Sequence, residues 1–234
     1  MNKSWNIEAA ILSVGLIVIG FCVMMGINNF ADRNRVVNVK GLAEIEVPAN
    51  KVTWPIVYKE LGNELPELYT RINTTNNAII AFLKRNGISD AEIAVKAPEV
   101  IDLRADRYSS NPTPQRYNIT SVITVTSNQV DKIRKLITSQ MELLKEGIAI
   151  VGGEYNNPIT YDYTALNTVK PKMIQEATKN ARATAEQFAE DSNSTLGKIM
   201  SANQGQFSIE DRDTNTPYIK KVRVVTTISY ALKD

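Results

Sequence analysis

Three tyrosines that lie close together in the chain are the first residues with a capacity for binding chemistry. Tyr155, Tyr161 and Tyr163 fall in one short stretch, and alternating aromatic residues on a strand can stack against a glycan or another ligand. The same spacing is typical of tyrosines that pack within a sheet or at an oligomer interface. Both interpretations remain open at this stage.

Arg182 is the second candidate. It lies in an alanine-rich stretch beside Ala181, with Ala185 four residues further on. Small residues at this spacing allow another element to approach a helix closely, and an arginine there can form a buried ion pair. The alternative is an ordinary surface arginine.

The composition excludes several kinds of chemistry. The 234 residues include no histidine and one cysteine, so a Ser-His-Asp triad, a His-ligated metal site and a CxxC redox pair are all impossible. The 27 basic residues nearly balance the 25 acidic ones, which gives no signal for nucleic acid. We therefore predict a protein that is not an enzyme and holds no cofactor or metal.

Two weaker motifs also have ordinary explanations. Gly152-Gly153-Glu154 can form an anion-binding nest, but a glycine pair more often marks a break in a strand. Asp102 and Asp106 could contribute to a Ca²⁺ site, yet the Asp-x-Asp-x-Asp-Gly loop is missing. A solvated, mixed-charge stretch is the simpler interpretation.

The N-terminal segment has the character of a membrane anchor. Residues 9–31 carry no charge, and the apolar run 9–27 would span about 28 Å as a helix, against about 30 Å for a bilayer core. The run is longer than a signal-peptide core, and no good cleavage site follows it. We expect an uncleaved single-pass anchor in the cytoplasmic (inner) membrane with the body in the periplasm. Secretion to the periplasm after cleavage is the alternative.

The rest of the chain alternates between strand-like and helix-like periodicity. Strands are predicted at 37–47, 52–58, 93–105, 117–126, 197–202 and 218–232. Two further strand pieces, 148–151 and 159–163, are separated by Gly152-Gly153. Helices are predicted from Pro66 to about residue 85, from about 129 to 144, and from about 168 to 188. The order ββαββαβαββ predicts an α+β fold of antiparallel sheets packed against helices, with two βαβ-like halves. We expect an anchor region, 1–34, and one domain, 35–234.

Three motifs in this order resemble those of the SIMPL domain family of bacterial cell-envelope proteins. The opening strand 37–50 (VNVKGLAEIEVPAN) is similar to the family pattern V-x-G-x-G-x-x-x-V-x-P-D. Segment 83–88 (LKRNGI), followed by Ile93, matches its L-x-x-x-G-I motif, and 177–185 (ATKNARATA) matches its A-x-x-x-A-R-x-K-A helix. The likeness covers about residues 36–233. Lys40, Asn50 and Thr184 depart from the pattern.

The resemblance implies an exported envelope protein that forms homo-oligomers. Some relatives are linked to stress defence and ring-like oligomers, and the family has no agreed catalytic residues. We therefore expect a membrane-tethered, non-catalytic, self-associating envelope module related to stress. A ligand-binding or chaperone-like receptor for an unknown small molecule is the alternative.

Overall fold

The computed structural model describes residues 3–32, 35–105, 114–151 and 156–233, which form two compact units. Unit 1 comprises Met1–Ile45, Asn167–Ser208 and Val222–Asp234, whereas unit 2 comprises Glu46–Leu166 and Ile209–Lys221. The chain thus leaves unit 1 early and returns to it twice. These units are not the two consecutive βαβ-like halves predicted from the sequence, because the first and last strands both contribute residues to unit 1.

The N-terminal region forms one long helix, α1 (Lys3–Asp32). None of the helices in the described ranges meets the combined requirement of length and apolar character for crossing a membrane.

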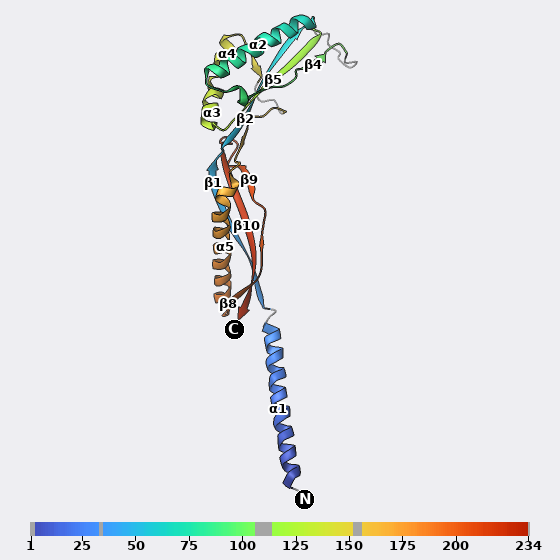
Figure 1. The fold of residues 1–234 in the computed structure, drawn as a ribbon, viewed down its shortest axis with the longest axis vertical. Helices are drawn as coiled ribbons and strands as arrows, with labels where there is room; N and C mark the ends of the chain where they lie inside the picture. Colours follow the sequence, from blue (N-terminus) through green and yellow to red (C-terminus); the bar gives the residue numbers. More distant parts are fainter. Residues whose placement is uncertain (1–2, 33–34, 106–113, 152–155, 234) are drawn as a thin grey trace. The chain divides into compact units, whose positions relative to one another are not determined.

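Unit 1 is an antiparallel sheet with one helix along it (Figure 1). The strand order is β1 (Val36–Pro48), β10 (Ile219–Lys233) and β8 (Thr195–Gln204), and helix α5 (Leu166–Asp191) lies beside them. Between the predicted strands 197–202 and 218–232 the structure has one more strand, β9 (Ser208–Asp211), which pairs with β10. Pro171 is the sixth residue of α5, beyond the first four N–H groups, so its missing N–H removes one intrahelical hydrogen bond.

The contact between α5 and the sheet is built from small residues. The buried positions of α5 recur every four residues: Met173, Ala177, Ala181, Ala185 and Ala189. A Cβ added to Gly41 of β1 would lie only 1.9 Å from the Ala177 carbonyl oxygen. The helix backbone therefore rests almost directly on β1, which is possible because neither surface carries a large side chain.

Unit 2 has a six-stranded antiparallel sheet centred on β2 (Lys51–Gly62) and β5 (Tyr117–Ser127). Two short strands, β3 (Ile93–Val95) and β4 (Glu99–Asp102), pair with β5, while β6 (Ile150–Val151) and β7 (Thr160–Asp162) pair with β2. The predicted strand 93–105 is therefore wrong in its continuity. Pro98 lies at the break, where it cannot donate to the ladder.

Pro55 lies within β2. A proline at this position predicts an edge strand or a bulge, yet β2 lies inside the sheet. The strands on its second side pair at residues 51–53 and at 57–58, so Pro55 lies in the gap between β7 and β6. A backbone donor is not required there.

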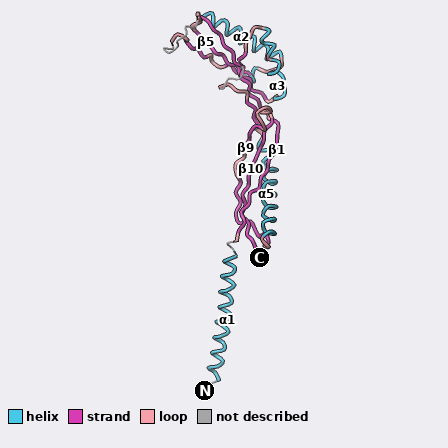
Figure 2. The backbone as a smooth tube through the Cα atoms, turned by 180° about the vertical axis from the view of Figure 1, so that it is seen from behind, coloured by secondary structure: helices cyan, strands magenta, loops and turns pink. Residues whose placement is uncertain are grey.

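Three α-helices of unit 2 lie on the same face of its sheet (Figure 2). They are α2 (Leu65–Arg85), α3 (Val130–Ser139) and α4 (Met141–Lys145), with a short 3₁₀ turn, η1 (Asp90–Glu92), after α2. The predicted helix 129–144 is interrupted at Gln140. The core beneath the helices consists of large aliphatic and aromatic side chains, including Trp54, Leu68, Phe82 and Ile123.

Candidate functional site

A surface groove in unit 2, with a volume of about 740 Å³, collects the aromatic and cationic side chains that could bind a ligand. We call it the aromatic groove. Helix α3 contributes four residues that lie on one helix face with the spacing i, i+3, i+4 and i+7, from Asp131 to Thr138. Strand β7 contributes Tyr161, and the segment before β10 forms the remaining side of the groove. Its lining residues are Asp131, Arg134, Lys135, Ile137, Thr138, Tyr161, Thr214, Asn215, Pro217 and Tyr218.

Two tyrosines and an arginine in the lining of this groove contact one another. The rings of Tyr161 and Tyr218 meet edge to face, with centroids 6.2 Å apart and planes at 71°. The guanidinium carbon of Arg134 lies 3.3 Å from the Tyr218 ring centroid, which is a close cation–π contact. Arg134 Nη1 also lies 3.4 Å from a carboxylate oxygen of Asp131, whose side chain is 89 % exposed.

The loop that carries Tyr218 is held by one carboxylate. Asp213 Oδ1 accepts hydrogen bonds from the backbone N–H groups of Asn215 and Thr216, both at 2.8 Å, and Asp213 Oδ2 accepts from the Thr216 hydroxyl. Arg212 Nε donates to the same carboxylate at 3.1 Å. The Thr216 hydroxyl, followed by Arg212 and the two backbone donors, lowers the pKa of Asp213 to about 2. The loop is therefore ordered before any ligand arrives.

Burial governs the electrostatics of Tyr161. Loss of solvent around its phenol raises the pKa of Tyr161 above its ordinary value, and the neighbouring Tyr218 acts in the same direction, whereas Arg134 opposes them. The Tyr161 hydroxyl therefore stays protonated at neutral pH and offers one donor and two acceptor positions.

The predicted tyrosine cluster is only partly the one that forms. Tyr161 lies in the groove, but its ring partner is Tyr218, which is distant in sequence. Tyr163 is half-buried and follows the end of β7, outside the groove lining. Tyr155 lies outside the described residues. Sequence reasoning missed Tyr218 and Arg134 because nothing in their spacing links them to Tyr161.

Arg182 is a surface residue. Its Nε donates to Glu186 Oε1 at 2.9 Å, one turn along α5, and its side chain is 69 % exposed. The hydrogen bond to Glu186 raises the pKa of Arg182. The interpretation as a buried ion pair is therefore wrong, and the surface interpretation is correct. The close approach to another element does occur, but at Ala181, the residue before Arg182.

The remaining acidic candidates are already engaged or lie outside the description. Asp102 Oδ2 accepts from Arg116 Nε and Nη2 at 3.0 and 2.9 Å, and this pairing lowers the pKa of Asp102. Among the residues that the structure places, no three acidic or cysteine side chains come together as metal ligands. Asp106 and the Gly152-Gly153-Glu154 motif are not among those residues.

The sequence matches the model of SIMPL, which is described as a protein of unknown function (DUF541), over residues 37–229. This range covers most of both units. The chain belongs to the SIMPL family. A search of curated proteins finds no match. Because the family has no assigned function, SIMPL membership neither names an activity nor excludes one.

The three SIMPL motifs acquire a physical meaning in the structure. In the opening strand, Gly41 is where helix α5 touches β1. In the second motif, Gly87 has a left-handed φ of 74°, and Ile88 beyond it is buried in the core of unit 2. In the third, Ala177, Ala181 and Ala185 form the buried face of α5. The motifs therefore mark close packing and a helix end.

The departures from the SIMPL pattern fall at tolerant positions. Lys40 is exposed on β1. Asn50 Oδ1 accepts from the Thr164 backbone N–H at 2.9 Å and from its hydroxyl at 3.1 Å, a role that an aspartate oxygen also fills. Thr184 is exposed and donates to the Asn180 carbonyl. None of these changes disturbs the packing that the motifs specify.

A second groove of this SIMPL protein, about 460 Å³, lies between α2 and the broken strand β3–β4 in unit 2. Exposed apolar side chains line it, including Tyr69 at 68 % and Val100 at 51 % exposure. In its lining, Asn76 accepts hydrogen bonds from the hydroxyls of Tyr58, at 2.9 Å, and Ser121, at 3.2 Å. This groove is mainly apolar, whereas the aromatic groove is charged and polar.

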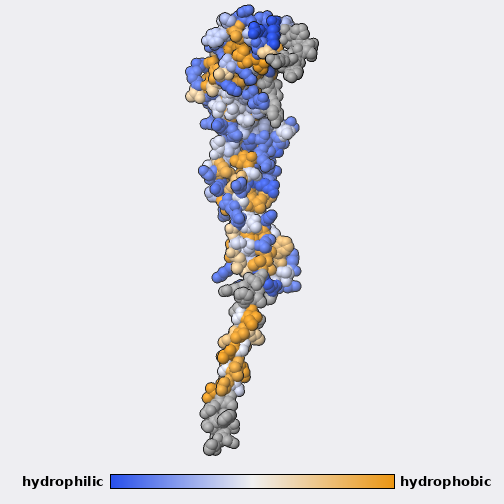
Figure 3. Space-filling model, turned by 90° about the vertical axis from the view of Figure 1, so that its right-hand side faces the viewer, coloured by the Kyte–Doolittle hydropathy of each residue, from blue (hydrophilic) through white to orange (hydrophobic). Residues whose placement is uncertain are grey.

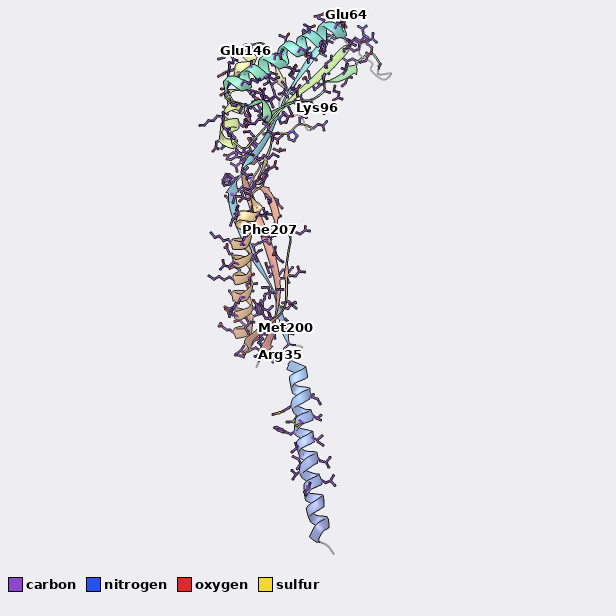
Figure 4. The ribbon with its side chains drawn as sticks, in the orientation of Figure 1. Arg35, Glu64, Lys96, Glu146, Met200 and Phe207 are labelled. Atoms are coloured by element: carbon purple, nitrogen blue, oxygen red, sulfur yellow. The ribbon has the colours of Figure 1, made fainter. Side chains whose placement is uncertain are left out.

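Strand β8 is the third surface of interest. It is the terminal strand of the unit 1 sheet, and most of its residues are exposed. Ile199 and Met200 are 52 % and 56 % exposed; Ile199 pairs with Tyr230 of β10 between two register shifts, and Met200 lies at one of these shifts. Met200 is labelled on β8 in Figure 4. An apolar pair on an edge strand is a feature that soluble monomers usually avoid.

Proposed function

We propose that this SIMPL protein is a membrane-tethered, non-catalytic module of the cell envelope that self-associates through strand β8. The observation that carries the proposal is the exposed apolar pair Ile199 and Met200 on an edge strand. A second copy would both cover these side chains and pair with the unused backbone groups of β8.

The composition of β8 supports pairing. Its sequence, TLGKIMSANQ, contains one charged residue, Lys198, and no proline. Edge strands that resist association usually carry several charges, a proline or a covering element. The register shifts bend β8, so a partner strand would pair with a short segment and the apolar pair would supply most of the buried area.

The opposite edge of the same sheet is less available. Asn180 of α5 donates its amide N–H to the Leu42 carbonyl of β1 at 2.8 Å, so a helix side chain satisfies a backbone group there. The exposed face of β1 also carries charge, at Lys40 and Glu44. These features favour β8 over β1 as the contact between copies.

The proposed tether is the uncharged run within α1. Its described side chains, at residues 11–27, are exposed and form a largely hydrophobic surface (Figure 3). Only a short connection separates Asp32 at the end of α1 from Val36 at the start of β1, so at most about 14 Å of extended chain joins them. A tethered unit 1 would stay beside the membrane, which raises the local concentration of copies.

Location and role belong to the same proposal. The cysteine-free body is compatible with the oxidising periplasm, and the lack of histidine narrows the catalytic groups available to it. A link to envelope stress rests on the family resemblance alone. It predicts that a strain lacking the gene survives envelope damage less well than a complemented strain.

The mass of the full-length protein in detergent tests the assembly. We expect an oligomer for the natural chain and a monomer for the double variant Ile199→Asp/Met200→Asp, because two charges would be buried without partners. Leu144→Asp is the matched control, since Leu144 is also 52 % exposed but lies on α4. A monomeric natural chain, or a double variant of unchanged mass, contradicts the proposed contact.

Extraction of membranes tests the tether separately. The full chain should stay in the membrane pellet after alkaline carbonate treatment and dissolve in detergent. Sequencing of the mature N-terminus distinguishes an anchor from a cleaved signal. A chain that begins after residue 31, or that dissolves in carbonate, would remove the tether from the proposal and leave the β8 contact to stand on its own test.

A further inference from the structure

We propose that the aromatic groove binds an acidic saccharide, with the guanidinium of Arg134 taking the carboxylate and the sugar ring packing beside Tyr161 and Pro217. This inference does not depend on the assembly or the tether, because every residue of the groove belongs to unit 2.

Arg134 is arranged for an oxyanion before one arrives. The contact of 3.3 Å between its guanidinium carbon and the Tyr218 ring centroid holds the group against the ring. A guanidinium in a fixed plane presents paired N–H groups that match the two oxygens of a carboxylate. Because little side-chain motion remains to be lost, the entropic cost of binding is low.

The ring under Arg134 is itself fixed. The Tyr218 carbonyl accepts a hydrogen bond from the Ala49 N–H at 2.8 Å, and the Asp213 carboxylate orders the loop just before it. Tyr161 braces the ring from the side with its edge-to-face contact. The Tyr218 ring is therefore positioned by its own backbone, by the loop before it and by the neighbouring ring of Tyr161.

The charges of the groove favour an anion. Arg134 and Lys135 line it together with one carboxylate, Asp131, and the other lining residues are neutral. Asp131 pairs with Arg134 at 3.4 Å, but this contact is weak because the Asp131 side chain is 89 % exposed. A ligand carboxylate can replace this weak contact with a bidentate one.

The neutral lining indicates a sugar rather than a bare anion. Tyr161, Pro217 and Ile137 supply apolar surface, while Thr138, Thr214 and Asn215 supply hydroxyl and amide groups. A sugar ring combines a C–H face with several hydroxyls and can use both sets. The volume of about 740 Å³ also lies within the range of about 300–1,000 Å³ typical of small-molecule sites.

Titration followed by NMR tests the inference on the full chain, in a polyoxyethylene detergent that carries neither sugar nor phosphate. The probes are D-glucuronate, D-glucose and acetate, which separate the acidic sugar from its ring and from its charge. We expect glucuronate to shift the amide signals of residues 131–138 and 214–218, and to bind more tightly than either of the other two probes.

Two variants locate the binding chemistry. Arg134→Lys keeps the charge but removes the planar fork, and should weaken glucuronate binding by about tenfold. Tyr218→Leu removes the supporting ring and should weaken it in the same direction. Arg85→Lys is the matched control, since Arg85 also pairs with a single carboxylate, that of Glu146, on the surface of unit 2. It should leave the affinity unchanged.

Four results would overturn the inference. If glucose binds as tightly as glucuronate, the groove does not recognise the carboxylate. If acetate binds as tightly as glucuronate, the groove does not recognise the sugar ring. Shifts confined to residues outside the groove would place the ligand elsewhere. The absence of any shift would remove the site. Amide spectra of each variant show whether the fold is kept, so weaker binding by Arg134→Lys in a folded chain supports the inference and unchanged binding contradicts it.

Discussion

The two units differ in the size of the side chains where their helices pack against their sheets. Unit 2 buries large side chains such as Trp54 and Phe82 between one sheet and three helices. Unit 1 buries alanines of α5 against Gly41 and the strand around it, and its core cluster also contains Val39, Ile228 and Tyr230. Both units remove apolar area from water, and unit 1 relies in addition on the close approach of a helix backbone to a strand backbone.

This difference predicts which mutations will destabilise each unit. A core of large side chains is damaged mainly by removing atoms, because the resulting cavity does not collapse fully. A contact built from small residues is damaged mainly by adding atoms, because no space exists for them. The two recognisable SIMPL motifs in unit 1 are of the second kind, so their glycine and alanines are steric requirements.

Phe82→Ala should have the largest effect on unit 2. The side chain is 1 % exposed, and deleting a buried phenyl ring costs about 3–5 kcal/mol. Trp54 is 1 % exposed in the same core, so its fluorescence during urea unfolding reports this unit once Trp5 has been changed to phenylalanine. We expect a clearly lower unfolding midpoint for the Trp54 signal.

Tyr69→Ala on the same helix provides the control. Tyr69 is 68 % exposed, so its removal should change the free energy of unfolding by no more than about 0.5 kcal/mol. If both variants lower the midpoint equally, burial does not distinguish the positions and the account of the unit 2 core fails.

Gly41→Ala should have the next largest effect, and it should fall on unit 1. The added Cβ would stand 1.9 Å from the Ala177 carbonyl oxygen and 2.5 Å from the Ala181 nitrogen, so the helix must shift away. Such overpacking lowers the free energy of unfolding by about 1–3 kcal/mol. We expect a value near the upper end of this range, because the clash is with backbone atoms. Hydrogen exchange should accelerate in peptides from α5 and much less in those from α2.

Two further variants sharpen this test. Leu42→Ala changes the next residue of β1, which is 42 % exposed, and should leave exchange in α5 nearly unchanged. Ala181→Gly should not rescue Gly41→Ala, because it removes one neighbouring Cβ and leaves the backbone atoms in place. Full rescue would mean that side chains, rather than backbones, define the contact.

The sequence predicted the elements of both units better than their grouping. Alternating apolar residues located β1, β2 and β10, and Gly87 located the end of α2, because these signals are local. The interleaving of the two units depends on which strands pair over long sequence distances, and periodicity carries no such information. The break at Pro98 carried a local signal, a proline within the predicted strand.

The candidate site shows the same limit more sharply. Tyr161 was recognisable as an aromatic residue near a strand, but its partners Arg134 and Tyr218 come from a helix and a loop far away in the chain. For Arg182 the surface interpretation is the correct one of the two, because alanines predict a close contact without fixing which neighbouring residue faces it. A sequence pattern therefore predicts that a ligand-binding or close-packed surface exists, whereas the tertiary structure determines which residues form it.

The smallest predicted effect concerns pH and the loop of the aromatic groove. The pKa of Asp213 is about 2 in the folded chain, below its ordinary 3.8, because the carboxylate accepts hydrogen bonds that need its charged form. Its stabilising contribution is therefore present above pH 3.8 and is lost as pH falls toward 2. Unfolding midpoints in urea should decline between pH 4 and pH 2 more steeply for the natural chain than for Asp213→Asn, which cannot ionise. Parallel declines would mean that this carboxylate does not hold the loop, and would weaken the case that Tyr218 and Arg134 are fixed before a ligand binds.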